Sequence, residues 1–164
     1  MSPVVRVLGA FGAEVAGAPA DLGGTRQRSV LARLVAARGR MVPADRLVGD
    51  LWGAAPPPRA AAGLQSFVSH LRRALEPDRP PRTPARILTT EPPGYALRLP
   101  DGAVDAWRFD ALIDASAALL DGDPAEARAS AEAALAEWRG PAYAEFAGLP
   151  WAAAEAARLE ERRR

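Results

Sequence analysis

The sequence predicts an α+β fold for its first hundred residues and an all-helical fold for the remainder. Two changes of pattern support this. Short β-branched runs at the start give way to helical periodicity after residue 25, and two apolar runs around a Pro-Pro-Gly turn then predict a hairpin. Beyond residue 105 the apolar pattern is helical throughout. We therefore expect one domain over residues 1–100, a second over 105–164, and a short polar linker over 100–104.

The composition is that of a soluble folded protein and excludes several kinds of site. The chain has 164 residues, of which 49% are hydrophobic and 25% charged, values typical of globular domains. No apolar run approaches the roughly 18 residues that cross a bilayer, and no leader pattern is present, so we expect a cytoplasmic protein with no membrane partner. With no cysteine and a single histidine, His70, we predict no disulfide, no metal site and no cofactor.

The charge is divided unevenly along the chain. All 21 basic residues are arginine, which excludes a lysine-containing phosphate-binding loop. Residues 1–100 carry 14 arginines against 7 acids, whereas residues 101–164 carry 7 arginines against 13 acids. This asymmetry indicates different partners for the two halves, with a polyanion as the partner of the first.

The first elements are expected to be short strands followed by a helix. The β-branched run at residues 4–8 predicts a strand, and residues 14–17 predict the return strand. From Thr25 the apolar residues recur at helical spacing. We expect Thr25 to cap this helix and Gly39 to end it.

Two further helices and a hairpin complete the first half. Residues 41–43 predict a short bridging strand, residues 44–52 a second helix and residues 59–75 a third. Residues 86–90 and 95–99 predict the two strands of a hairpin. Three helices followed by a hairpin describe a winged helix-turn-helix with the hairpin as its wing.

The second half is expected to contain helices only. Helical periodicity covers about residues 106–120, 124–138 and 150–161. Small residues at close-packing positions of the second of these helices are typical of helical hairpin repeats, so we expect part of a larger helical stack.

The third helix has two contrasting faces. Leu64, Val68 and Leu71 belong to an apolar face that we expect to pack on the core. The opposite face has small residues, hydroxyls, an amide and arginines but no carboxylate, as a helix in the major groove requires. Near the ends of the hairpin, two more arginines could reach phosphates. The predicted DNA-binding residues from this pattern are Arg59, Ala62, Gln65, Ser66, Ser69, His70, Arg72, Arg73, Arg86 and Arg98.

Several motifs, in order along the chain, resemble the Streptomyces antibiotic regulatory protein family. They are Leu22-Gly-Gly-Thr-Arg-Gln-Arg28, Asp45-Arg-Leu-Val48 with Leu51-Trp-Gly53, Leu64-Gln-Ser-Phe-Val-Ser69, Leu71-Arg-Arg-Ala-Leu75, Pro92-Pro-Gly-Tyr95 and Ala134-Leu-Ala-Glu-Trp-Arg-Gly-Pro141. The last resembles that family's bacterial transcriptional activation domain, whose helix pairs are similar to tetratricopeptide repeats. The first half resembles a response-regulator output domain, although the chain contains no phosphoacceptor receiver domain.

The resemblance implies an activator of secondary-metabolite (antibiotic) genes. Family members bind direct repeats in promoter DNA, which implies a homodimer on double-stranded DNA, and they recruit RNA polymerase. It places the third helix in the major groove and the wing turn, including Gly94, beside the minor groove. It also implies that a loop contacts polymerase; the residues of this loop are Gly53, Ala54, Ala55, Pro56, Pro57 and Pro58.

The chain departs from the family pattern in three places. An arginine commonly precedes the wing Pro-Pro-Gly-Tyr, and this chain has Glu91; a carboxylate there would face the minor groove, so we expect a weaker anchor. Gly63 lies within the recognition helix, where it costs about 1 kcal/mol relative to alanine. The second half is also shorter than a full repeat array, so we expect a truncated form of it.

Two other functions remain open on the residues alone. The chain could be an interaction module whose winged helix and acidic helical half dock a protein without reading DNA sequence. It could also be an enzyme with paired acids, either Asp105 with Asp110 or Glu132 with Glu137. We expect these acids to form a solvated face, because nothing in the sequence supplies an apolar pocket around them, and we predict no enzyme.

Overall fold

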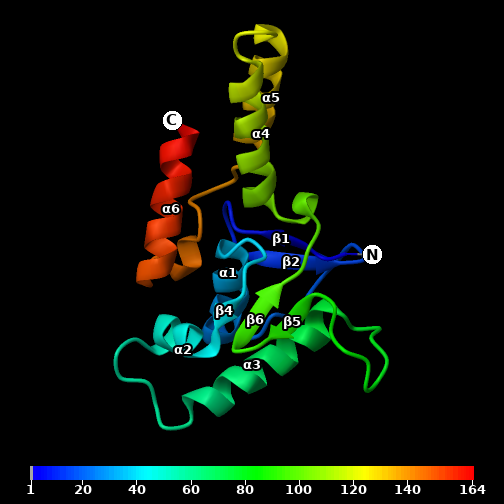
Figure 1. The fold of residues 1–164 in the computed structure, drawn as a ribbon, viewed down its shortest axis with the longest axis vertical. Helices are drawn as coiled ribbons and strands as arrows, with labels where there is room; N and C mark the ends of the chain where they lie inside the picture. Colours follow the sequence, from blue (N-terminus) through cyan, green and yellow to red (C-terminus); the bar gives the residue numbers. More distant parts are fainter. Residues whose placement is uncertain (1) are drawn as a thin grey trace.

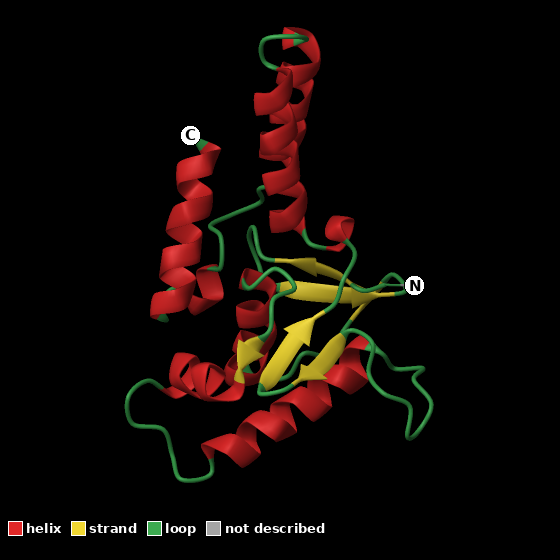
Figure 2. Ribbon diagram, in the orientation of Figure 1, coloured by secondary structure: helices red, strands yellow, loops and turns green. Residues whose placement is uncertain are grey.

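The computed structural model describes residues 2–164 and has the expected α+β architecture (Figures 1 and 2). A winged helix-turn-helix forms one end of the molecule, with α3 along its outer side. The α4–α5 helix pair projects from the opposite side, and α6 returns alongside α1 (Figure 1). The predicted fold class is therefore confirmed.

The N-terminal sheet is antiparallel and has the strand order β1-β2-β3. Its strands are β1 (Val4–Arg6), β2 (Gly12–Val15) and β3 (Ala18–Pro19). Val5 is opposite Ala13, and both side chains are buried. Period-two alternation in β1 thus directs Val5 to the core and leaves Val4 exposed.

The three helices of the first half are α1 (Thr25–Ala36), α2 (Ala44–Trp52) and α3 (Ala60–Leu75). The expected cap of α1 is wrong: Thr25 is the first helical residue, and the capping position is Gly24, whose lack of a side chain leaves no cap hydrogen bond. Gly39 has a φ of +84° in the turn after α1, a conformation that glycine adopts without strain.

The wing is a three-stranded antiparallel sheet with the order β4-β6-β5. Its strands are β4 (Val42–Pro43), β5 (Leu88–Glu91) and β6 (Gly94–Leu97). The predicted bridging strand is present as β4. Each hairpin strand is two residues shorter than predicted at the end away from the turn and one residue longer at the turn. Leu88 pairs with Leu97, and both are buried against the core.

The second half consists of α4 (Asp105–Leu119), α5 (Pro124–Ala136) and α6 (Pro150–Arg163), with two short 3₁₀ helices, Asp101–Ala103 and Ala144–Phe146. The side chain of Asp123 accepts a hydrogen bond from the backbone N–H of Glu126, so it caps α5. No helix within residues 2–164 is long and apolar enough to span a bilayer.

The expected polar linker is correct for residues 100–102, which are exposed, and wrong for the last two residues. Ala103 and Val104 are buried, and Val104 forms a parallel β-bridge with Val5. The end of the connection between the halves is therefore part of the core. The expectation of solvated acids is also wrong for Asp105 and Asp110, whose exposed fractions are 0% and 7%.

Candidate nucleic-acid interface

The two faces of α3 are separated as the periodicity predicts. Ala60, Leu64, Val68, Leu71 and Leu75 are buried against the core. A second apolar contact packs the middle of α3 on the end of α2: the ring of Phe67 stacks on that of Trp52, with centroids 6.1 Å apart. Gly63 also faces Trp52, since a Cβ built at this glycine would lie 3.5 Å from the indole. These contacts fix the rotation of α3 about its axis.

The opposite face of α3 is exposed and contains no carboxylate. Its exposed predicted residues are Ala62, Gln65, Ser66, Ser69, His70 and Arg73. Arg59, at the capping position before the helix, is exposed as well. Within residues 2–164 neither Arg59 nor Arg73 has an ion-pair partner, so both guanidinium groups face solvent. The face is compatible with close approach to phosphates and base edges.

Arg72 contacts the wing instead of projecting into solvent. Its Nε donates to the carbonyl of Leu88 at 2.8 Å and its Nη2 to the hydroxyl of Thr90 at 2.7 Å. Its guanidinium also lies 5.8 Å from the centroid of the Tyr95 ring. Burial lowers the pKa of Arg72, although the group stays charged at neutral pH. Arg72 therefore positions the wing against α3.

Arg98 is paired with the carboxylate of Glu91. Two of its nitrogens donate to the Glu91 oxygens at 2.5 and 2.8 Å, and a third donates to the carbonyl of Gly39. The hydrogen bonds from Arg98 and Thr89 lower the pKa of Glu91. The charge of Glu91, which departs from the family motif, is thus neutralised within the wing. As a consequence, the guanidinium of Arg98 is no longer free to contact a phosphate.

The other predicted wing residues have different surroundings. Arg86 is exposed, and its backbone N–H donates to Glu76. Gly94 is buried, and a Cβ there would lie 1.9 Å from the carbonyl oxygen of Val42. The close approach of β4 and β6 therefore requires glycine at position 94 for packing.

His70 lies beside the N-terminal end of α1. Its Nδ1 is 3.2 Å from the side-chain oxygen of Gln27, whose amide nitrogen donates to the carbonyl of Leu22. The ring is exposed on the flank of the outward face of α3. Among residues 2–164 no group of three potential ligands could hold a metal ion.

The loop predicted to contact polymerase, residues 53–58, is exposed along its whole length between α2 and α3. Its three prolines lack the backbone N–H that a helix needs, so neither α2 nor α3 can continue through them. The loop lies at the opposite end of α3 from the segment that leads into the wing (Figure 1).

The most consequential residue that the sequence analysis misjudged is Asp105. Its carboxylate accepts hydrogen bonds from the backbone N–H groups of Val7, at 2.9 Å, and Leu8, at 3.0 Å. It also accepts from the N–H of Ala106 and from the guanidinium of Arg139. Asp105 therefore fastens the start of α4 to the end of β1, two segments almost a hundred residues apart.

A second polar cluster joins the turn after α1 to α4 and α6. Asp110 on α4 forms ion pairs with Arg38 at 2.5 Å, Arg158 at 2.9 Å and Arg162 at 2.7 Å. Glu155 on α6 shares two of these partners, Arg38 at 3.0 Å and Arg158 at 2.8 Å. The two halves of the molecule are thus held in one orientation by charge pairs as well as by apolar packing.

A third polar contact between the halves involves Arg28 on α1. Its guanidinium forms a bidentate ion pair with the carboxylate of Glu145, with N···O distances of 2.9 and 3.0 Å. It also donates a hydrogen bond to the carbonyl of Phe11. Because two guanidinium nitrogens each bind one carboxylate oxygen, the pair fixes the relative orientation of the two side chains in addition to neutralising their charges. Residue type and spacing gave no signal for the pairs that join the two halves, because each of those links positions far apart in the sequence.

Glu155 makes the folding stability of the protein depend on pH. Burial, together with the nearby Asp110, raises the pKa of Glu155 to about 7, while Arg38 and Arg33 oppose the shift. Between its ordinary pKa and about 7, the folded chain therefore holds a proton that the unfolded chain releases. Linkage then requires stability to fall as pH rises through this window.

We expect the free energy of unfolding to decrease by about 1–3 kcal/mol between pH 5 and pH 8, the range that a shift of this size permits. Urea titrations followed by circular dichroism at the two pH values measure it. In Glu155→Gln, which cannot titrate, the decrease should be smaller. An equal decrease in the wild type and the variant would contradict the assignment to Glu155.

Comparison with known proteins supports both halves of the fold. Residues 20–97 match the family described as "Transcriptional regulatory protein, C terminal", and residues 104–164 match the family described as "Bacterial transcriptional activator domain". Together these two matches cover most of the chain, in the order that the sequence motifs predict. The chain belongs to the Streptomyces antibiotic regulatory protein family.

Relatives of this family member are transcriptional regulators. Transcriptional regulatory protein EmbR of Mycobacterium tuberculosis is 40% identical over 136 residues, which is 82% of this chain and 34% of that protein. Transcriptional regulator RedD of Streptomyces coelicolor is 32% identical over 159 residues, 97% of this chain and 45% of that protein. Regulatory protein AfsR of Streptomyces coelicolor is 36% identical over 141 residues, 85% of this chain and 13% of that protein.

A solved structure has the same arrangement of both halves. Mycobacterium tuberculosis EmbR in complex with a low-affinity phosphopeptide superimposes with a TM-score of 0.88 and 35% sequence identity. The match covers 99% of this family member and 42% of that chain. The chain thus spans less than half the length of these relatives.

Proposed function

We propose that this chain is a sequence-specific DNA-binding transcriptional regulator that reads promoter DNA through the outward face of α3. The observation that supports the proposal most strongly is the exposed face without carboxylates, with Ser66, Ser69 and Arg73 projecting away from the core. Small and hydroxyl side chains permit close approach to the major groove, and an arginine can form two hydrogen bonds to guanine or a phosphate. The relatives' role as regulators is consistent with this.

Arg73 and Gln65 are the proposed base-reading residues of α3. Gln65 can form paired hydrogen bonds with adenine. Arg73 is the better placed of the two arginines at the end of α3, because Arg72 is engaged with Leu88 and Thr90. Arg59 and Arg86 are the proposed phosphate contacts. Arg98 contributes less than the sequence predicts, because its charge is paired with Glu91.

We further propose that the regulator activates antibiotic biosynthesis genes by recruiting RNA polymerase. The exposed loop over residues 53–58, together with the helical second half, would provide the contact surface. Two copies would bind direct repeats in the promoter. The exposure of the loop and its separation from the wing support this arrangement, since polymerase and DNA could then be bound at the same time.

Replacing Arg73 with alanine is expected to weaken binding to the preferred duplex by about 1–3 kcal/mol, because a base contact is lost while the fold is unchanged. The duplex is obtained by selecting bound sequences from a random library, and affinity is measured by fluorescence anisotropy. The matched control is Arg128→Ala on α5, which removes the same charge from an exposed position. Equal affinities for Arg73→Ala and the wild type would remove this residue from the site.

A further inference from the structure

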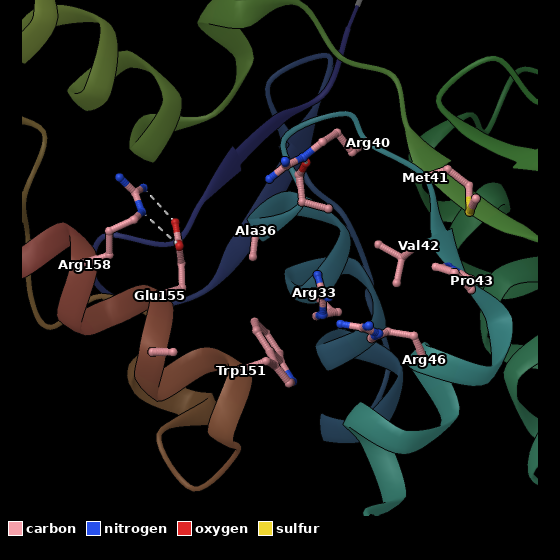
Figure 3. Close-up of a pocket in the computed structure, with 12 residues that line it drawn as sticks. Arg33, Ala36, Arg40, Met41, Val42, Pro43, Arg46, Trp151, Glu155 and Arg158 are labelled. Atoms are coloured by element: carbon pink, nitrogen blue, oxygen red, sulfur yellow. Dashed lines mark hydrogen bonds and ion pairs between the residues drawn. The ribbon is translucent and has the colours of Figure 1, made fainter.

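An open groove of about 640 Å³ lies between the two halves of the molecule (Figure 3). One wall is formed by α1, β4 and the start of α2, and the other by α6. Its volume is within the range of small-molecule sites, which are commonly found where two domains meet. The outward face of α3 does not contribute to it, so DNA bound there would leave the groove open.

The groove carries an excess of positive charge. Four guanidinium groups line it, from Arg33, Arg40, Arg46 and Arg158, against the single carboxylate of Glu155. Arg33 is paired with Asp50 at 2.7 Å, and Arg158 is paired with Asp110 and Glu155.

The remaining two arginines are not neutralised. Within residues 2–164 neither Arg40 nor Arg46 has an ion-pair partner, and the only side-chain hydrogen bond from Arg40 goes to the carbonyl of Ala37. Both residues are exposed. Unpaired guanidinium groups beside a concave surface attract anions and can hold a phosphate by two hydrogen bonds.

The lining is also apolar and aromatic. Ala36, Ala37, Met41 and Val42 contribute hydrocarbon surface, and the indole of Trp151 enters the groove from α6. Figure 3 shows Trp151 projecting toward the side of Arg33 and Arg46. The indole also packs on Tyr143 and Phe146, with ring centroids 5.8 and 6.1 Å apart. An occupant with both a flat apolar ring and anionic groups would match this lining.

We propose that the groove binds a nucleotide-sized organic phosphate, with its aromatic ring against Trp151 and its phosphates held by Arg40 and Arg46. Such a ligand contacts the winged helix and α6 together. It therefore favours the docked arrangement of the two halves and couples ligand concentration to their orientation. The site is independent of the DNA-binding face and does not rest on the proposed function.

The test is a titration of the full chain with N-methylanthraniloyl ADP, detected by energy transfer from tryptophan to the probe. The expected result is saturable binding that unlabelled ADP displaces. Arg40→Ala and Arg46→Ala should each weaken it about tenfold or more, the usual effect of losing a hydrogen bond to a charged group. Arg128→Ala, with the same change in net charge far from the groove, should bind as the wild type does.

Three results would overturn the proposal. The first is no saturable binding of the probe at millimolar concentration. The second is an equal loss in Arg128→Ala and Arg46→Ala, which indicates general charge attraction. The third is displacement by random duplex DNA or polyglutamate as effectively as by ADP, which assigns the patch to a macromolecule. Thermal melts of each variant verify folding, and unchanged probe binding by Arg73→Ala separates this site from the DNA-binding face.

Discussion

Replacing Asp105 with asparagine is expected to lower the free energy of unfolding by about 2–4 kcal/mol, because a fully buried acceptor of several hydrogen bonds is replaced. The carboxylate receives N–H groups from Val7, Leu8 and Ala106 through both of its oxygens. An asparagine has one acceptor oxygen, and its NH₂ group would oppose a backbone N–H that has no other partner. A loss of this size is a large fraction of the stability of a typical domain, about 5–15 kcal/mol.

Urea denaturation followed by circular dichroism measures this change. Asp121→Asn, at an exposed position in the turn between α4 and α5, is the matched control and should alter stability by less than about 0.5 kcal/mol. If Asp105→Asn is as stable as the control, the carboxylate does not fasten α4 to β1, and the account of how the halves dock is wrong.

Introducing a carboxylate into the outward face of α3 should abolish DNA binding without unfolding the protein. Ser66 is exposed near the middle of this face, so Ser66→Glu places a negative charge where the DNA is proposed to lie. Repulsion from the phosphates and the loss of close approach should reduce affinity by at least about a hundredfold. Stability should change by less than about 0.5 kcal/mol, because the site is exposed and glutamate favours helix.

Fluorescence anisotropy with the selected duplex measures the loss of affinity in Ser66→Glu. Ala129→Glu on α5 is the matched control, since it adds the same charge at an exposed helical position outside the proposed interface. The control should bind DNA nearly as well as the wild type. Similar affinities for Ser66→Glu and Ala129→Glu would mean that α3 does not face the duplex.

The sequence predicted most helices to within a few residues because their apolar periodicity is strong. The predicted α2 coincides with Ala44–Trp52, and the buried face of α3 contains the expected leucines and valine. The cap of α1 was mispredicted because Thr25 has a capping side chain, whereas the backbone turns one residue earlier, at Gly24. Local residue preference alone could not distinguish these two positions.

The surroundings of polar side chains were much less predictable. Arg72 and Arg98 were assigned to DNA by residue type, but their partners are carbonyls and side chains that the tertiary fold brings to them. Asp105 and Asp110 were interpreted as solvated acids because their neighbours on α4 include other charges. Apart from the neighbouring Ala106, the partners of Asp105 are Val7 and Leu8 just after β1 and Arg139 after α5, between 34 and 98 positions away. Asp110 pairs with Arg38 in the turn after α1 and with Arg158 and Arg162 on α6, and the two on α6 are 48 and 52 positions away. Spacing along one helix contains no information about such contacts.

The central claim is that the outward face of α3 recognises a particular DNA sequence. The most direct measurement is an equilibrium competition in which the selected duplex and a scrambled duplex of equal length compete for the wild-type chain at physiological salt. We expect the selected duplex to bind at least about a thousandfold more tightly than the scrambled one. Equal affinity for both duplexes would contradict sequence-specific regulation and favour a protein-docking role for the winged helix.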